Sequence, residues 1–187
     1  MEDRKKVLIK LLRDSSEDVR RSAAEALERL EGLANLDSLI ARYRTGDKVV
    51  KLKVIYALGK LRSEACLPVI IHALSSEDED LRSAAVRMLG EMGDPRGLQP
   101  LLNLLHDESL TIQTLVVEAL ANFPRHNLVA HLLPVLDREN KHLVMSALRT
   151  LSALNAVEAL DRIIELTRHD DPEVRKTAAI VLGEIEG

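Results

Sequence analysis

Six histidines are the residues in this sequence best suited to chemistry, because imidazole binds transition metals and exchanges protons near neutral pH. His72 and His131 are expected to face one groove, but they lie two structural repeats apart. Packed helices are about 8–10 Å apart, which separates the two rings by roughly 20 Å, whereas a zinc–nitrogen bond is about 2.1 Å long. His106 lies between them, and no row of acidic ligands accompanies it. The histidines therefore predict no metal site and no cofactor.

The sequence also lacks the patterns that mark an active site. No nucleophile motif and no phosphate-binding loop occurs, and no carboxylate pair with helical spacing lies in the expected groove. The single cysteine, Cys66, shares a row with Gly97, Leu128 and Ala159, which predicts a small core residue and not a reactive thiol. One cysteine excludes an internal disulfide and fits a reducing cytosol. We therefore expect a protein without catalytic residues.

Composition narrows the class of partner. The chain has 187 residues, of which 46% are hydrophobic and 30% charged, so it is expected to fold. Aromatic residues make up only 2%, which argues against a platform for stacking nucleic-acid bases. The net charge is −4, although residues 1–62 carry 15 basic and 10 acidic side chains. Because acids are interleaved with these bases, a solvated surface is favoured over a nucleic-acid site.

The N-terminus is charged, and it leads directly into an amphipathic pattern. The longest apolar stretches span only a few residues. This pattern predicts neither a signal peptide nor a transmembrane helix. We therefore expect a cytoplasmic protein that does not contact a membrane.

The elements that position these residues are revealed by an internal period of 31 residues. The period aligns an invariant leucine row, Leu27, Leu58, Leu89, Leu120, Leu151 and Leu182. Further apolar rows at offsets of three and four form one stripe of an α-helix, which we name helix A, roughly residues 17–30 in the first copy. Each copy is preceded by a residue suited to cap a helix N-terminus, namely Ser16, Asp47, Asp78, Ser109, Asn140 and Asp171.

A second apolar stripe, exemplified by Leu39, Ile70, Leu101, Leu132 and Ile163, predicts a helix B in each repeat. The chain then consists of a leading B helix over 3–13, five A–B repeats over about 16–167 and a final A helix over about 171–186. This organisation amounts to about twelve helices and no strand. Such units bury their apolar faces only by stacking, so we expect one solenoid domain over residues 1–187.

The motifs inside these repeats resemble a known family. Asp80-Leu81-Arg82-Ser83-Ala84-Ala85, followed by Leu89-Gly90-Glu91-Met92-Gly93-Asp94-Pro95, resembles the short HEAT-like repeat first named from phycobilisome lyases. Asp171-Pro172-Glu173-Val174-Arg175 resembles it again. The resemblance implies a right-handed α-α superhelix with helix B on the concave side, and a basic residue at the position of Arg82 that tethers neighbouring repeats. The HEAT-like enzyme deoxyhypusine hydroxylase uses His-Glu dipeptides as iron ligands, and this chain has none.

The solvent-facing rows of the middle B helices are nearly free of charge. Interface cores are depleted in charge in the same way, although short exposed helices also carry such residues without binding anything. We predict a partner-binding surface formed by Pro68, Val69, His72, Gln99, Pro100, Asn103, His106, Ala130, His131 and Pro134.

Two functions fit this reading. The first is a non-catalytic scaffold or adaptor that binds a peptide or protein in the concave groove. The alternative, implied by the resemblance alone, is a lyase- or chaperone-like factor acting on a bilin chromophore protein. A linear tetrapyrrole needs arginines for its propionates, and the groove centre has none, so the first function is preferred. The final A helix carries Ile180 in a row that holds Glu25, Arg87, Glu118 and Arg149 in other repeats, which suggests self-association through the C-terminal helix.

Overall fold

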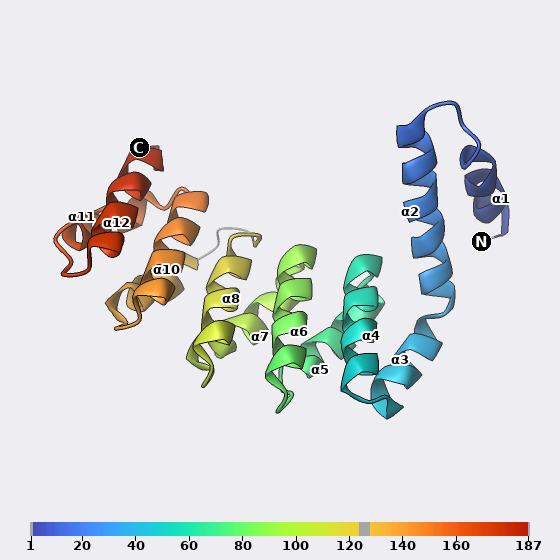
Figure 1. Ribbon diagram of the computed structural model, residues 1–187, viewed down its shortest axis with the longest axis horizontal. Coiled ribbons are helices and arrows are strands. Elements are labelled where there is room, and N and C mark those ends of the chain that lie inside the picture. The colour runs from blue at the N-terminus through green and yellow to red at the C-terminus, as the bar shows by residue number, and fades with distance from the viewer. Residues whose placement is uncertain (1, 124–127, 187) are drawn as a thin grey trace. The chain divides into compact units, whose positions relative to one another are not determined.

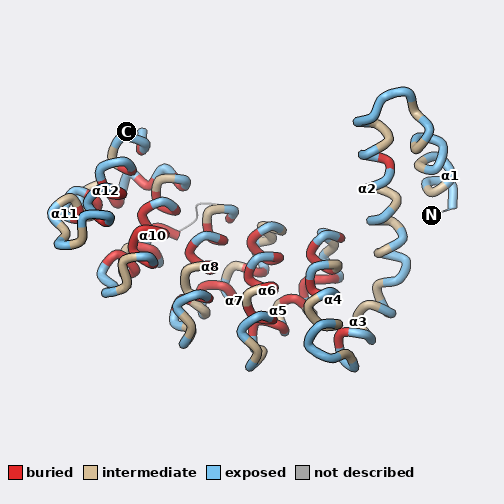
Figure 2. The backbone as a smooth tube through the Cα atoms, viewed as in Figure 1, coloured by how far each residue is buried: buried red, intermediate tan, exposed pale blue. Residues whose placement is uncertain are grey.

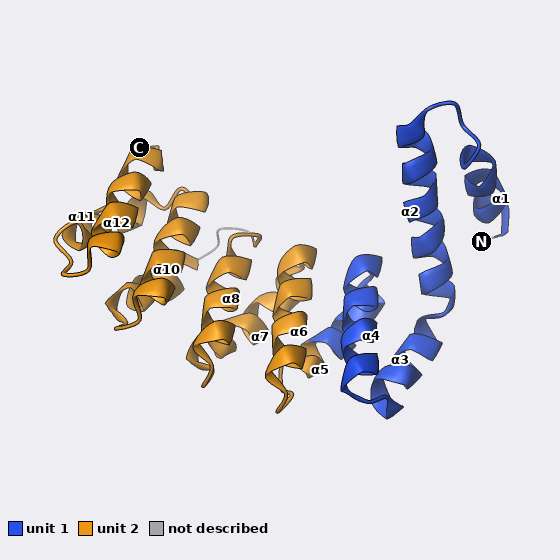
Figure 3. Ribbon diagram, viewed as in Figure 1, with its two compact units in different colours: residues 1–70 blue, residues 71–187 orange. Residues whose placement is uncertain are grey.

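The computed structural model describes residues 2–123 and 128–186, and within these ranges all regular structure is helical (Figure 1). The chain divides into two compact units, residues 1–70 and 71–187, and the division falls inside α5 (Leu67–Ala73) (Figure 3).

The first unit contains four long helices and the 3₁₀ turn η1 that leads into α5. In chain order the elements are α1 (Glu2–Leu11), α2 (Glu17–Ala34), α3 (Leu36–Thr45), α4 (Lys48–Leu61) and η1 (Glu64–Cys66). Helix α2 packs on α1 and α4, and α3 packs on α4. Burial is sparse at the start of this unit, since α1 has no buried residue and α2 buries only Ala23 (Figure 2).

The second unit is two-layered. One layer holds the long helices α6 (Glu79–Met92), α8 (Leu110–Leu120), α10 (Lys141–Ala153) and α12 (Pro172–Glu184), each packed on the next. The other holds short α-helices joined to 3₁₀ turns: η2 (Pro95–Gly97), α7 (Leu98–Asn103), η3 (Leu104–His106), α9 (Leu128–Leu132), η4 (Leu133–Asp137), η5 (Val157–Ala159) and α11 (Leu160–Leu166).

The repeating rows form the core of the second unit. Leu89, Leu120 and Leu151 are fully buried between the long helices (Figure 2). Leu101, Leu132 and Ile163 of the short helices are buried against them. Burying such a side chain stabilises the fold by roughly 1.5–3 kcal/mol, so the period of 31 residues specifies this core directly. The row is less well covered at its ends, where Leu27 and Leu182 are only half-buried.

The predicted N-caps are confirmed at five of six positions. Asp47, Asp78, Ser109, Asn140 and Asp171 each accept a hydrogen bond from a backbone N–H in the first turn of the following helix. The prediction is wrong for Ser16, whose side chain makes no capping bond. Its backbone N–H instead donates a hydrogen bond to the Asp14 carboxylate, in the turn that precedes α2.

Asp171 caps α12 and also ties it to the previous long helix. Its carboxylate accepts hydrogen bonds from the Lys141 ammonium at 3.0 Å and from the Glu173 backbone N–H at 2.8 Å. The Lys141 ammonium first, and the Glu173 backbone N–H second, hold the pKa of Asp171 below its ordinary value of 3.8. The carboxylate is therefore more acidic in the folded protein than in the unfolded chain.

We expect this difference to produce an acid-dependent loss of stability. The folded state binds fewer protons at Asp171, so the contribution is fully present above pH 3.8 and disappears as pH falls through the lowered folded pKa. Asp171→Asn keeps the capping oxygen but removes the charge. The variant should melt below wild type at pH 7, and the difference between the two melting temperatures should shrink as pH falls below 3.8 and through the lowered folded pKa of Asp171. A difference that does not shrink would contradict this account.

Helix α2 is longer than the sequence predicted. We expected helix A of the first repeat to end near residue 30, but it continues to Ala34. In three later repeats the equivalent turn holds a residue with positive φ, at Arg62, Gly93 and Asn155. The first repeat has Glu31 at this position, followed by Gly32, Leu33 and Ala34. Because glutamate, leucine and alanine favour the helix, the chain stays helical through the turn.

Candidate functional site

The predicted partner-binding residues lie on the short helices and their 3₁₀ turns. In the second unit His72, Gln99, Asn103, His106, Ala130, His131 and Pro134 are exposed, and Pro100 is half-exposed. Pro68, which is exposed, and Val69, which is half-exposed, lie in the first unit. Exposure of these side chains meets the first requirement of a binding surface, and their role in binding stays a prediction.

Only a few contacts organise these residues. The Gln99 amide donates a hydrogen bond to the Asn103 side-chain oxygen at 3.3 Å, one turn along α7. The His106 Nδ1 atom lies 3.1 Å from a guanidinium nitrogen of Arg138.

Across residues 2–123 and 128–186, no three histidine, cysteine, aspartate or glutamate side chains come together as metal ligands. In the same ranges, no helix has the length and apolar character required to cross a membrane.

Cys66 lies in the core, as its row predicted. The residue is fully buried at the end of η1. Burial raises the pKa of its thiol, because the thiolate loses hydration. A thiol of this kind is protonated and inaccessible, so it does not serve as a nucleophile.

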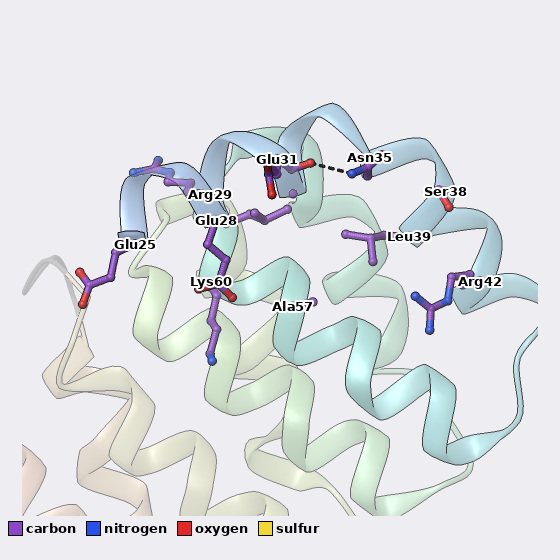
Figure 4. A pocket seen from close by; sticks show the side chains of 12 residues that line it. Glu25, Glu28, Arg29, Glu31, Asn35, Ser38, Leu39, Arg42, Ala57 and Lys60 are labelled. Atoms are coloured by element: carbon purple, nitrogen blue, oxygen red, sulfur yellow. Dashed lines mark hydrogen bonds between the residues drawn. The ribbon is translucent and has the colours of Figure 1, made fainter. Parts of the chain in front are cut away.

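A cavity of about 850 Å³ lies between α2, α3 and α4 of the first unit, and none of the predicted partner-binding residues lines it (Figure 4). Ligand pockets in proteins commonly have volumes of about 300–1,000 Å³. Its lining residues are Glu25, Glu28, Arg29, Glu31, Gly32, Asn35, Ser38, Leu39, Arg42, Ala57, Lys60 and Leu61. All of them belong to one compact unit, so the cavity is a property of that unit alone.

The extension of α2 accounts for the position of the cavity. The last turns of α2 contribute Glu28, Arg29, Glu31 and Gly32, and α3 begins after the single residue Asn35. At Gly32 an added Cβ would lie 2.4 Å from a methyl carbon of Leu61, so α2 approaches the end of α4 closely there. A glycine at this point lets the two helices approach each other closely.

The cavity combines apolar walls with charges of both signs. Leu39, Ala57 and Leu61 supply apolar surface. Figure 4 shows the Arg29 and Lys60 side chains towards one end of the lining and Arg42 towards the other, with Leu39 directed into the space between them. These three cations make no ion pair or hydrogen bond within the part of the chain that the structure describes.

One acidic residue of the lining is already neutralised. The Lys5 ammonium lies 2.6 Å from the Glu31 carboxylate. A side-chain hydrogen bond to Glu31, with the attraction between the two charges, raises the pKa of Lys5. Around the cavity this leaves Arg29, Arg42 and Lys60 against the carboxylates of Glu25 and Glu28, a net positive balance.

Sequence reasoning missed this cavity because it examined only the outward rows of the B helices. The signal was present in the repeat alignment, where Glu31 replaces the turn residues Arg62, Gly93 and Asn155. A repeat that lacks its turn signal is expected to depart from the regular packing of its neighbours. The extended α2, which is this departure, contributes Glu28, Arg29, Glu31 and Gly32 to the lining of the cavity.

Comparison with protein families agrees with the repeat analysis. A family model described as HEAT repeats matches residues 36–121 and 129–187, and a model described as HEAT repeat matches residues 6–31. The chain therefore belongs to the HEAT repeat family. The resemblance drawn from the 31-residue period and from the motif around Arg82 is confirmed.

Among curated proteins, two similar relatives are bilin biosynthesis proteins named PecE. The protein from Nostoc sp. PCC 7120 is 30% identical over 148 residues, covering 77% of this chain and 58% of that protein. The protein from Mastigocladus laminosus is 28% identical over 148 residues, covering 77% and 55% respectively. This chain thus spans little more than half the length of these relatives. They favour the bilin alternative over the general adaptor that the sequence analysis preferred.

Solved structures show the same architecture. A chain in the complex of CpcE and CpcF of phycocyanin lyase from Nostoc sp. PCC7120 superposes with a TM-score of 0.63 at 20% identity, covering 80% of this chain and 98% of that one. An archaeal HEAT-like repeats protein from Thermococcus onnurineus NA1 gives a TM-score of 0.52 at 16% identity, covering 97% and 86%. At these identities the similarity shows the fold.

Proposed function

We propose that this chain belongs to a lyase- or chaperone-like factor that acts on a bilin chromophore protein, together with a second HEAT-repeat chain. The observation that carries the proposal is the 30% identity to PecE over 77% of this chain. The architecture shared with a chain of the CpcE–CpcF complex supports a function in a two-chain assembly.

The role of this chain in such a factor is to bind and orient, without forming a covalent bond to the bilin. Its one cysteine, Cys66, is fully buried and has a raised pKa, so it is not placed to carry a bilin as a thioether. This agrees with the absence of a nucleophile motif from the sequence. The reaction partners then meet on surfaces of the chain, and the chain itself is unchanged by the transfer.

We assign protein contact to the exposed residues of α7, η3, α9 and η4. The side chains of Gln99, Asn103, Ala130 and Pro134 have no ionisable group, and interface cores are depleted in charged residues. Each of the last two helices also exposes a large apolar side chain, Ile164 (49% exposed) on α11 and Ile180 (52% exposed) on α12. We propose that these side chains contact the partner chain or a second copy of this one.

Covalent attachment of bilin tests the proposed function. Phycocyanobilin and an apo-phycocyanin subunit are incubated with this chain, with CpcF of the Nostoc lyase, with both or with neither. The yield of protein-bound bilin is read in acidic urea, where only covalently attached pigment remains. We expect the yield with both chains to exceed that of either alone severalfold. Equal yields with and without this chain would contradict the proposal.

The protein-contact surface is tested in the same assay. Asn103→Arg combined with Ala130→Glu places charges on the exposed surface, and Arg87→Glu on the exposed side of α6 serves as the matched charge change elsewhere. The double variant should reduce the attachment yield, whereas Arg87→Glu should not. If the double variant and Arg87→Glu give the same attachment yield, the protein contact lies on another surface.

A further inference from the structure

We infer that the cavity between α2, α3 and α4 is the site where the bilin itself binds. This inference rests on the proposed function, and it adds the location of the ligand and the residues that hold it. The sequence analysis set the bilin alternative aside because the groove centre lacks arginine. The cavity of the first unit supplies two arginines and a lysine at its lining.

An open-chain tetrapyrrole places three chemical demands on its site. Its two propionates are carboxylates that need cationic hydrogen-bond donors, and arginine is the donor best matched to a carboxylate. Its pyrrole N–H groups are donors that need acceptor oxygens. Its conjugated rings present a broad apolar face, which is stabilised when it is removed from water.

The cavity meets the three demands with separate groups. Arg29, Arg42 and Lys60 are available to the propionates, since none of them is engaged by another described residue. Glu25 and Glu28 supply acceptor oxygens for the N–H groups. The apolar part of the lining consists of Leu39, Ala57 and Leu61.

Charge balance favours an anionic ligand in this cavity. Lys5 neutralises Glu31 from outside at 2.6 Å, so that three cations remain against two carboxylates at the lining. The volume of about 850 Å³ lies within the usual range for a small-molecule site. The cavity is open to solvent on one side, because most of its polar lining residues are exposed. A pigment that must later be passed to another protein requires such an opening.

Direct titration tests the site. Phycocyanobilin is added to the purified chain, and the dissociation constant is obtained from the change in its visible absorbance. We compare wild type with Arg29→Gln, Arg42→Gln and Lys60→Gln, which keep a polar side chain but remove the charge. Arg44→Gln on α3 and Lys53→Gln on α4 are the matched controls, because both residues are exposed and outside the lining.

We expect each of the three lining variants to raise the dissociation constant about tenfold, the usual effect of losing one charge-assisted hydrogen bond. The two control variants should bind as wild type does. The dimethyl ester of the bilin, which lacks both carboxylates, should bind wild type as weakly as the triple variant binds the free acid. Circular dichroism of each variant verifies that the helices are intact.

The outcomes separate this inference from the proposed function. The triple variant carries all three substitutions, Arg29→Gln, Arg42→Gln and Lys60→Gln. If it binds the bilin as tightly as wild type does, or if wild type binds the ester and the acid equally well, the assignment of the cavity is overturned. If wild type binds no bilin but still increases covalent attachment, the cavity assignment fails and the proposed function stands. If wild type neither binds bilin nor increases attachment, both fail.

Discussion

Replacing Arg82 by methionine is expected to lower the unfolding free energy of the second unit by about 3–5 kcal/mol, the usual cost of removing one partner of a buried ion pair. The Arg82 side chain is 7% exposed and lies at the N-terminal turn of α6. Its guanidinium donates hydrogen bonds to the backbone oxygens of Ser76 and Glu77, at 2.9 and 3.1 Å, and to the Asp107 carboxylate at 3.1 Å.

The effect is large because Arg82 connects two successive loops. Methionine matches much of its apolar volume but leaves two loop carbonyls and the 7% exposed Asp107 carboxylate without this partner. Arg20 and Arg175, at equivalent positions, also donate to two loop carbonyls each, and Gln113 donates to the Asp107 backbone oxygen at 2.7 Å. The tether implied by the family resemblance is therefore visible at Arg82, where it reaches the next repeat.

Urea unfolding followed by circular dichroism measures the effect. Arg87→Met on the exposed side of α6 is the matched control and should change stability by no more than about 0.5 kcal/mol. The double variant Arg82→Met, Asp107→Leu should be more stable than Arg82→Met alone, because it also removes the carboxylate left without its partner. A double variant no more stable than Arg82→Met alone would show that the loss comes from the loop carbonyls and not from the unpaired Asp107 carboxylate.

Most of the fold could be predicted from the sequence because one packing unit is used repeatedly. The inner residues of the leucine row have similar surroundings, so the 31-residue pattern predicts the burial of Leu89, Leu120 and Leu151. At the ends of the row, Leu27 and Leu182 are only half-buried. Cap residues are equally predictable, because their hydrogen bonds depend on only four neighbouring residues. Local preference and tertiary packing agree at these positions.

The cavity could not be predicted from the same rows, because it depends on the spacing of three helices. The conformational preferences of single residues do not predict how α3 is placed relative to α4 when α2 is longer than expected. The polar rows of the B helices indicated an exposed surface, and exposure is what Gln99, Asn103 and His131 show. Whether a partner covers these exposed residues depends on a second molecule. The periodic pattern of this sequence gives no information on that molecule. The extension of α2, where the first repeat departs from the others, is the sequence feature that points to this cavity.

Gly90→Ala is expected to destabilise the second unit by about 1–3 kcal/mol, the usual range for overpacking a close contact. Gly90 lies in α6 where this helix crosses α8. A Cβ added there would lie 2.7 Å from the Ala119 Cβ and 3.2 Å from the Ala119 Cα. Because one of these atoms belongs to the backbone, relief requires the two helices to separate, and the loss outweighs the gain in helix propensity of about 0.5–1 kcal/mol.

Gly183 provides a matched control, because it occupies the equivalent row three repeats later, near the end of α12, and an added Cβ would meet no atom within 4 Å. Gly183→Ala should therefore leave stability unchanged or raise it by at most about 1 kcal/mol, through helix propensity alone. Combining Gly90→Ala with Ala119→Gly should recover most of the stability lost by Gly90→Ala, since the extra methyl then fits into the space vacated by Ala119. Urea unfolding of the four proteins measures these differences. Equal effects at Gly90 and Gly183 would show that helix propensity, and not the close crossing of α6 and α8, sets the requirement for glycine in this row.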